Sequence, residues 1–113
     1  MKIYHNPKCS KSREALAIVE KNASVFEIIE YLKNPLTVEE IKLLLPKLNI
    51  KAIELIRIQE SIWKDNYKGV QMNDDEIINA IVNHPKLMER PIITTNKKGV
   101  IGRPPENVLD LFS

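Results

Sequence analysis

The fold is decided by one stretch of this chain, Tyr4-His5-Asn6-Pro7-Lys8-Cys9-Ser10-Lys11-Ser12-Arg13. A short apolar segment precedes it, and apolar residues at helical spacing follow it. The Asn-Pro pair is a turn pattern that ends the first strand, and we expect Ser10 or Ser12 to cap the following helix. The single cysteine of the chain, Cys9, is therefore expected at the start of a helix.

A cysteine at a helix start meets the positive end of the helix dipole and free backbone N–H groups. Lys8, Lys11 and Arg13 add positive charge around Cys9. Both effects favour the thiolate, which is the nucleophilic form, and the same groups can hold a small anion beside the sulfur. The alternative is an inert core position, which is common for free cysteine. Because Cys9 has polar and charged neighbours, we expect a reactive nucleophile.

Ser12 occupies the position that the second cysteine of a Cys-x-x-Cys motif would take. A disulfide formed by Cys9 must then involve an outside thiol, most simply glutathione or a protein dithiol. Helix capping is the alternative role for Ser12, and the two roles are compatible. We expect His5 to orient or stabilise the thiolate; its alternative is a polar residue at a strand end.

The composition is that of an ordinary folded protein, with 113 residues, 43% hydrophobic and 28% charged. We expect one domain over residues 1–113. A net charge of +2 without a basic run argues against a nucleic-acid partner. One cysteine with His5 and His84 makes a poor metal-ligand set. Without a signal-peptide pattern or an apolar run of ~20 residues, no membrane association and a cytoplasmic location are expected.

The first half of the chain alternates strand and helix patterns. The first helix is expected to end at Lys21-Asn22, and residues 25–32 predict a second strand because they are rich in β-branched and aromatic side chains. A strand, a helix and a strand of this length predict a right-handed βαβ unit with a parallel pair.

The middle of the chain predicts three helices. Thr37 begins the first with a capping box, and Pro46 is expected to disturb its end. The second covers residues 52–63 and is followed by a loop over 63–72. The third begins at Asn73, where acidic residues in the first turn suit the helix dipole.

The C-terminal part predicts an antiparallel hairpin, formed by residues 92–95 and 100–102 around a turn. A last helix is expected from Pro104, with Val108, Leu109, Leu111 and Phe112 packing inward. The order β-α-β-α-α-α-β-β-α is typical of an α/β, thioredoxin-like fold with a four-stranded mixed sheet and an inserted helical block. Pro91, just before the third strand, is a candidate for a cis peptide bond facing the thiol.

Three arginines are candidate oxyanion ligands, because guanidinium groups bind tetrahedral oxyanions through paired hydrogen bonds. Arg57 lies in an otherwise apolar stretch, where a cation needs a partner. Arg90 and Arg103 each precede a proline at an element boundary. The common alternative is a solvated surface arginine. If the three converge on Cys9, they form a site of phosphate, sulfate or arsenate size.

Segments 5–13, 89–92 and 101–106 together resemble the ArsC family, the glutaredoxin-linked arsenate reductases with a thioredoxin-like fold. The resemblance covers essentially the whole chain, with the segments in order and suitably spaced. It implies a cysteine thiolate that attacks arsenate, with glutathione as co-substrate, glutaredoxin as protein partner and no bound cofactor. By motif position, Cys9 resembles the nucleophile and His5 the histidine that assists its ionisation. Arg57, Arg90 and Arg103 resemble the oxyanion-binding arginines.

Two departures from the family pattern keep other functions open. The best-known arsenate reductases of the family carry Cys-Gly-Thr-Ser where this chain has Cys9-Ser10-Lys11-Ser12, and they are longer at the C-terminus. The present version resembles the short, YfgD-like branch, for which arsenate need not be the physiological substrate. The alternatives are an RNA polymerase-binding regulator of the Spx type, which typically carries the second cysteine that Ser12 replaces, and a glutathione-linked transferase acting on protein mixed disulfides.

Overall fold

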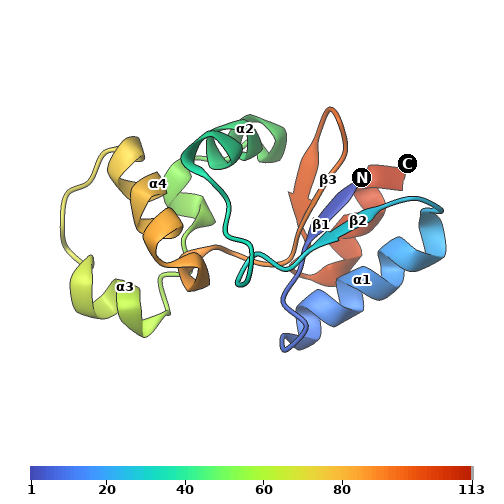
Figure 1. Ribbon diagram of the computed structural model, residues 1–113, viewed down its shortest axis with the longest axis horizontal. Coiled ribbons are helices and arrows are strands. Elements are labelled where there is room, and N and C mark those ends of the chain that lie inside the picture. Colours follow the sequence, from blue (N-terminus) through green and yellow to red (C-terminus); the bar gives the residue numbers. More distant parts are fainter. Residues whose placement is uncertain (113) are drawn as a thin grey trace. The chain divides into compact units, whose positions relative to one another are not determined.

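The computed structural model describes residues 1–112 (Figure 1). Along the chain the elements are β1 Lys2–Tyr4, α1 Ser10–Asn22, β2 Glu27–Ile29, α2 Val38–Leu48, η1 Ala52–Leu55, α3 Ser61–Asn66, α4 Asp74–Asn83, η2 Pro85–Leu87, β3 Ile92–Thr94, β4 Gly99–Ile101 and η3 Pro105–Phe112, where η marks a 3-10 helix. The described chain divides into two compact units. We call residues 1–34 with 90–112 the sheet unit, and residues 35–89 the helical unit.

The sheet unit contains a four-stranded mixed sheet in the order β2-β1-β3-β4, which confirms the predicted α/β architecture. β1 pairs in parallel with β2 and antiparallel with β3, and β4 is antiparallel to β3. Tyr4 lies opposite Ile92, and Ile92 opposite Ile101. The chain therefore leaves β1, enters β3 and leaves β4 at the same edge of the sheet. This register positions the candidate site.

The core of the sheet unit lies on one face of the sheet, where α1 and η3 pack (Figure 1, blue and red). Its fully buried residues are Ile3, Ala15, Val19, Ile93 and Val108. Ala15 and Val19 are four residues apart, so they share one face of α1. Fully burying an aliphatic side chain of this size stabilises a fold by about 1.5–3 kcal/mol, which fixes α1 against the sheet.

The helical unit is built on two helices with complete capping boxes; the box at Thr37 was predicted, and at Asn73 only a helix start was predicted. Thr37 accepts from the Glu40 N–H, and the Glu40 carboxylate accepts from the Thr37 N–H. Asn73 and Glu76 repeat this arrangement at the start of α4. α2 and α4 contact each other, and their buried residues include Ile41, Leu44, Ile77, Ile78 and Ile81.

The predicted helix over residues 52–63 is wrong. The chain forms the short helix η1, then an extended segment in which Ile56 bridges Met88, and only then α3. Arg57 N–H donates to Leu87 O at 2.7 Å and Glu89 N–H to Leu55 O at 2.8 Å, so backbone pairing with a distant segment replaces the helix. The loop predicted over 63–72 is also shorter, because α3 continues to Asn66.

Other boundaries differ for local reasons. The second strand covers only Glu27–Ile29, the residues that pair with β1. α2 continues past Pro46, and Asn49, in the left-handed conformation at φ 55°, ends it. The last helix is a 3-10 helix, in which Leu109 is exposed and does not pack inward.

No helix within residues 1–112 is both long enough and apolar enough to cross a lipid bilayer.

Candidate thiolate site

Cys9 is the N-cap residue of α1, so the prediction that Ser10 or Ser12 caps this helix is wrong. Its backbone is extended, with φ −97° and ψ 123°, and its carbonyl accepts from Arg13 N–H at 3.0 Å. Cys9 N–H donates to Asn6 O at 3.0 Å, which closes the turn before the helix. The side chain is half-buried and carries a free thiol. Cys9 thus lies at a helix start, as predicted.

The pKa of the Cys9 thiol is lowered by its surroundings. Burial raises this pKa, but the Ser12 N–H, the charge and side chain of Arg90, and the Lys11 N–H together outweigh burial. The sulfur makes no side-chain capping hydrogen bond of regular geometry, so the N–H groups stabilise negative charge mainly as nearby dipoles. The geometry therefore favours a thiolate.

Arg90 is the cation that lowers the pKa of this thiol, and one of its hydrogen-bond donors is unpaired. Its Nε is buried and has no hydrogen-bond partner among the described residues. Leaving a buried charged donor unpaired is costly, so Arg90 Nε can donate to an anionic ligand without giving up an existing hydrogen bond. The bond between Arg90 and Pro91 is cis, the form for which the sequence made Pro91 a candidate.

Arg103 follows the end of β4, at the same edge of the sheet as the end of β1 and the start of β3. Its side chain is exposed. The preceding Gly102 is buried, and its N–H donates to Pro91 O at 2.8 Å. A Cβ on Gly102 would lie 3.0 Å from the Pro91 ring and 3.3 Å from Ala15. The close packing of Gly102 against Pro91 and Ala15 therefore holds the backbone before Arg103 against the segment that carries Arg90 and against α1. The Arg103–Pro104 bond is also cis, which the sequence did not indicate.

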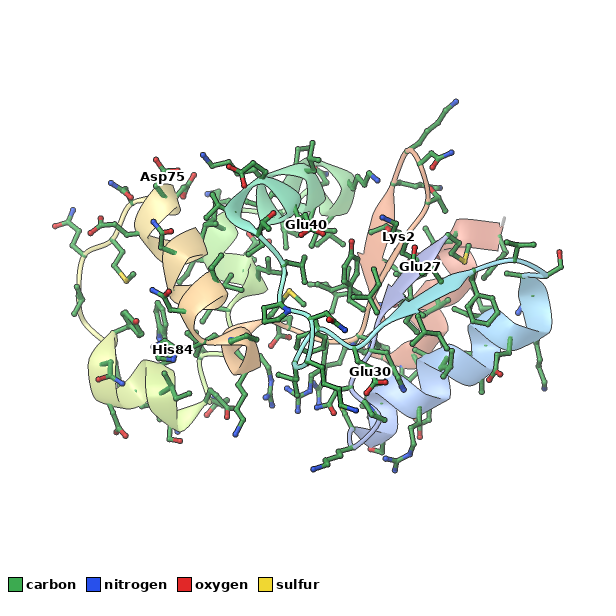
Figure 2. All side chains as sticks on the ribbon, viewed as in Figure 1. Lys2, Glu27, Glu30, Glu40, Asp75 and His84 are labelled. Carbon is green, nitrogen blue, oxygen red and sulfur yellow. The ribbon has the colours of Figure 1, made fainter. Side chains whose placement is uncertain are left out.

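Ser12 and His5 are joined on the buried side of the turn. Ser12 Oγ lies 2.6 Å from His5 Nδ1 and accepts from Asn6 N–H at 3.0 Å. Burial lowers the pKa of His5; Glu30, which follows β2 (Figure 2), opposes this change, and Arg13 adds to it. His5 is therefore held mainly neutral near pH 7. The structure records a hydrogen bond between the side chains of His5 and Ser12, so His5 acts on the turn.

The exposed side of the same turn is held by a residue whose role the sequence did not reveal. Arg13 Nη1 donates to Pro7 O at 2.9 Å, and Lys8 N–H donates to the Asn6 side chain at 3.1 Å. Together with Ser12 on the buried side, Arg13 clamps the turn before Cys9. Only the contact itself, between residues six positions apart, identifies this role.

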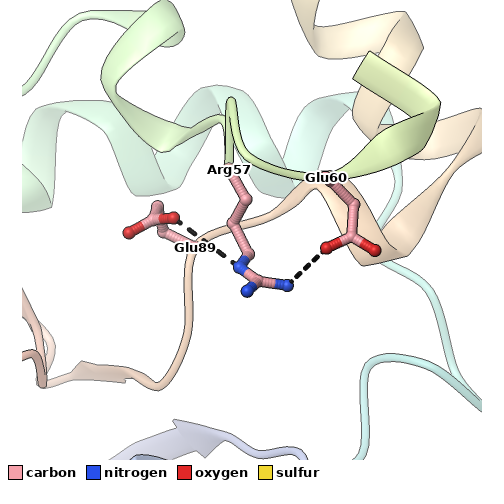
Figure 3. A network of polar contacts seen from close by, with 3 residues as sticks. All are labelled: Arg57, Glu60 and Glu89. Carbon is pink, nitrogen blue, oxygen red and sulfur yellow. Dashed lines mark hydrogen bonds and ion pairs between the residues drawn. The ribbon is translucent and has the colours of Figure 1, made fainter. Parts of the chain in front are cut away.

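Arg57 belongs to the helical unit and already has acidic neighbours there (Figure 3). Its Nη1 lies 2.8 Å from a Glu60 carboxylate oxygen, and its Nε lies 3.9 Å from Glu89. The expectation that this cation needs a partner is confirmed. Its assignment as an oxyanion ligand stays a prediction.

Residues 1–112 contain no group of three or more His, Cys, Asp or Glu side chains arranged to hold a metal ion. His84 is the C-cap residue of α4 (Figure 2), and its ring meets Tyr67 edge-on at 6.2 Å. This packing gives His84 a structural role.

Comparison with known proteins gives the class to which this fold and site belong. A profile of the ArsC family matches residues 4–111. The chain therefore belongs to the ArsC family, as its three sequence segments suggested, and its thioredoxin-like fold agrees with this assignment.

Individual relatives are similar over almost their full length. The YfgD protein of Escherichia coli K12 is 43% identical, covering 98% of this chain and 95% of its own. An arsenate reductase of Haemophilus influenzae is 41% identical, covering 97% of each chain. A solved structure called arsenate reductase, from Vibrio cholerae, superposes with a TM-score of 0.91 at 43% identity, covering 97% of both chains.

Proposed function

We propose that this protein is an arsenate reductase, an oxidoreductase that reduces arsenate to arsenite through Cys9. The observation that carries the proposal is the lowered pKa of the Cys9 thiol beside Arg90, whose buried Nε is unpaired. A thiolate next to a free guanidinium donor suits an anionic electrophile. Similarity to proteins named arsenate reductase supports the choice of arsenate as that electrophile.

The oxyanion is bound by arginine side chains. Arg90 and Arg103 both lie at the sheet edge that Cys9 follows, and guanidinium groups neutralise the charge that would otherwise repel the thiolate. Arg57 is proposed as a third ligand on family resemblance alone. Its two carboxylate neighbours would have to share it with the substrate.

The reaction proceeds in three exchanges. The Cys9 thiolate attacks arsenic, forming an S–As bond while one arsenate oxygen leaves as water after protonation. A glutathione thiolate then attacks the Cys9 sulfur; the electron pair of the S–As bond stays on arsenic, which leaves as arsenite. A glutaredoxin thiolate then attacks the glutathione sulfur of the mixed disulfide, a new disulfide between glutaredoxin and glutathione forms, and Cys9 leaves as the thiolate.

Ser12 explains why outside thiols are needed, since it cannot form the disulfide that a second cysteine would form. In this mechanism Ser12 and His5 hold the turn that presents Cys9. Glutathione is a co-substrate, glutaredoxin is the protein partner, and no bound cofactor takes part. The reducing cytoplasm supplies both thiols and is the proposed location.

Arsenite production from arsenate, with glutathione and glutaredoxin supplied, tests the proposal. Wild-type protein is compared with Cys9→Ala and with Lys21→Gln, an exposed change in the last turn of α1 that controls for handling of the variants. We expect activity to vanish in Cys9→Ala and to persist in Lys21→Gln. Full activity in Cys9→Ala would refute the assignment of Cys9 as the nucleophile. Activity in the absence of glutathione and glutaredoxin would refute their assignment as the reductants.

Binding measurements test the arginines separately. Changing Arg90 or Arg103 to Ala is expected to weaken arsenate or sulfate binding by ~1.5–3 kcal/mol, the range for hydrogen bonds to charged groups. Calorimetry with each anion measures the loss. Unchanged affinity in either variant removes that arginine from the site.

A transferase acting on glutathionylated proteins is the second candidate, because the same lowered pKa of Cys9 would serve it. Reduction of a glutathionylated peptide in the absence of arsenate distinguishes the two functions. A rate well above the rate of arsenate reduction would favour the transferase.

A further inference from the structure

Two sets of cations surround Cys9, and the structure separates them by what they act on. Arg90 is half-buried and lowers the pKa of the thiol. Lys8 and Lys11 are exposed, and their side-chain charges are not among the causes that lower this pKa; only the Lys11 backbone N–H contributes. The side-chain charges of these two lysines therefore contribute little to the lowered pKa of Cys9, and both residues are exposed to solvent.

Little negative charge compensates these two lysines. No ion pair of Lys8 is recorded within residues 1–112, and Lys11 has only Glu14, at 3.6 Å. The Lys11 and Glu14 side chains are 45% and 55% exposed, so solvent weakens their interaction. Lys8 immediately precedes the nucleophile and Lys11 lies in the first turn after it. A molecule that approaches the sulfur passes within about one Debye length, roughly 8 Å, of this charge.

We infer that Lys8 and Lys11 form an outer cationic rim that selects anionic thiols and disulfides as exchange partners of Cys9. The inference rests on the proposed function in one respect, since that function requires an outside thiol. It adds which chemistry the thiol carries: carboxylate groups close to the sulfur, as in glutathione. Opposite charge at the rim of a site raises the association rate more than it changes the chemical step.

The reaction that reports on the rim is thiol–disulfide exchange. The Cys9 thiolate attacks one sulfur of a small disulfide, a new S–S bond forms, the old one breaks, and the second sulfur leaves as a thiolate. The disulfide is the oxidant, and no other reactant is required. Arsenate takes no part in this exchange. The role of Lys8 and Lys11 can therefore be refuted while arsenate reduction is confirmed, and arsenate reduction can be refuted while the role of the lysines is confirmed.

The test uses three probes that differ in charge: dithiobis(nitrobenzoate), which is anionic; dithiodipyridine, which is neutral at pH 7; and cystamine, which is cationic. The double variant Lys8→Gln/Lys11→Gln is compared with wild type. Lys21→Gln is the matched control, because ten residues of α1 place it about 15 Å from Lys11. At an ionic strength of about 0.1 M, where the Debye length of about 10 Å is shorter than the distance to Lys21, we expect the anionic probe to react about three- to tenfold more slowly with the double variant.

The other probes and the titration of the thiol show whether Lys8 and Lys11 select anionic reaction partners or instead activate Cys9 by lowering its pKa. With the double variant the neutral probe should react at the wild-type rate and the cationic probe should react faster, and high salt should remove the differences seen with the anionic and cationic probes. The ultraviolet titration of the thiolate should be unchanged in the double variant. By contrast, Arg90→Met should raise the pKa of Cys9 and slow every probe below that pKa. Equal loss for all probes, or a raised pKa in the double variant, would overturn the inference.

Discussion

Ser12 Oγ and His5 Nδ1 lie 2.6 Å apart, in a buried contact that joins the end of β1 to the first turn of α1. The same hydroxyl accepts from Asn6 N–H at 3.0 Å. The Ser12 hydroxyl is thus a hydrogen-bond partner of both the His5 side chain and the Asn6 backbone, at the end of the turn that follows β1. Since Ser12 also supplies an N–H that lowers the pKa of Cys9, this contact couples the shape of the turn to the chemistry of the thiol.

Replacing Ser12 with Ala should destabilise the fold. Ser12 and His5 are both buried, so the His5 ring nitrogen would lose its partner without gaining water, and the part-buried Asn6 N–H would lose the same hydroxyl. A buried polar group left unpaired costs about 1–3 kcal/mol. Urea unfolding measures the change, and Ser10→Ala, at an exposed position two residues earlier, is the matched control. Equal stability of the two variants would contradict the role of Ser12.

The free energy of unfolding should fall on mild acidification because of His5. Its pKa in the folded state lies below the ordinary value of 6.5, chiefly through burial. Between the folded and unfolded pKa values the unfolded chain binds more protons, so stability rises with pH in that window. The contribution of His5 is therefore present above pH 6.5 and lost as the pH falls through the folded pKa.

Unfolding of wild type, His5→Gln and His84→Gln at a series of pH values measures this contribution. The fall in stability below pH 6.5 should be shallower in His5→Gln than in wild type. His84→Gln controls for the removal of an imidazole elsewhere. The same slope in wild type and His5→Gln would show that burial does not lower the pKa of His5 in the folded chain.

Local patterns predicted those features of the fold that depend on local interactions. The predicted capping box at Thr37 and the predicted helix start at Asn73 each depend on residues within one turn, and both form. The helix predicted around Arg57 did not form, because its backbone pairs with Leu87, thirty residues later. Such long-range pairing overrides helix propensity and leaves no periodic pattern in a single sequence.

The candidate site was predictable to the same extent. Cys9 could be placed at a helix start because the strand, turn and helix patterns are contiguous. The neighbourhood of Arg90 and Arg103 depends on strand register, and the burial of Arg90 Nε depends on the packing around it. Neither can be deduced from spacing along the chain. The residue pattern made these arginines candidates, and the family resemblance added the expectation that they act at one site.

Arg57 and Glu60 should interact more strongly than an exposed ion pair. Their side chains are only 21% and 24% exposed, and the charged atoms lie 2.8 Å apart. A double-mutant cycle with Arg57→Met and Glu60→Gln is expected to give a coupling energy of about 1.5–3 kcal/mol. Lys42 and Asp75, at 3.5 Å and more than half exposed, provide the comparison, at about 0.2–1 kcal/mol. Equal coupling in both pairs would contradict this difference.

Gly102 should not tolerate a side chain, because its neighbours cannot move away. A Cβ there would lie 3.0 Å from the Pro91 ring and 3.2 Å from the Ile93 Cδ1 atom. Both residues are buried, so we expect Gly102→Ala to cost about 1–3 kcal/mol in urea unfolding and to weaken sulfate binding by displacing Arg103. Ile93→Val removes the Cδ1 contact. If crowding is the cause, the double variant is more stable than the two single losses predict, whereas simple additivity would exclude crowding against Ile93.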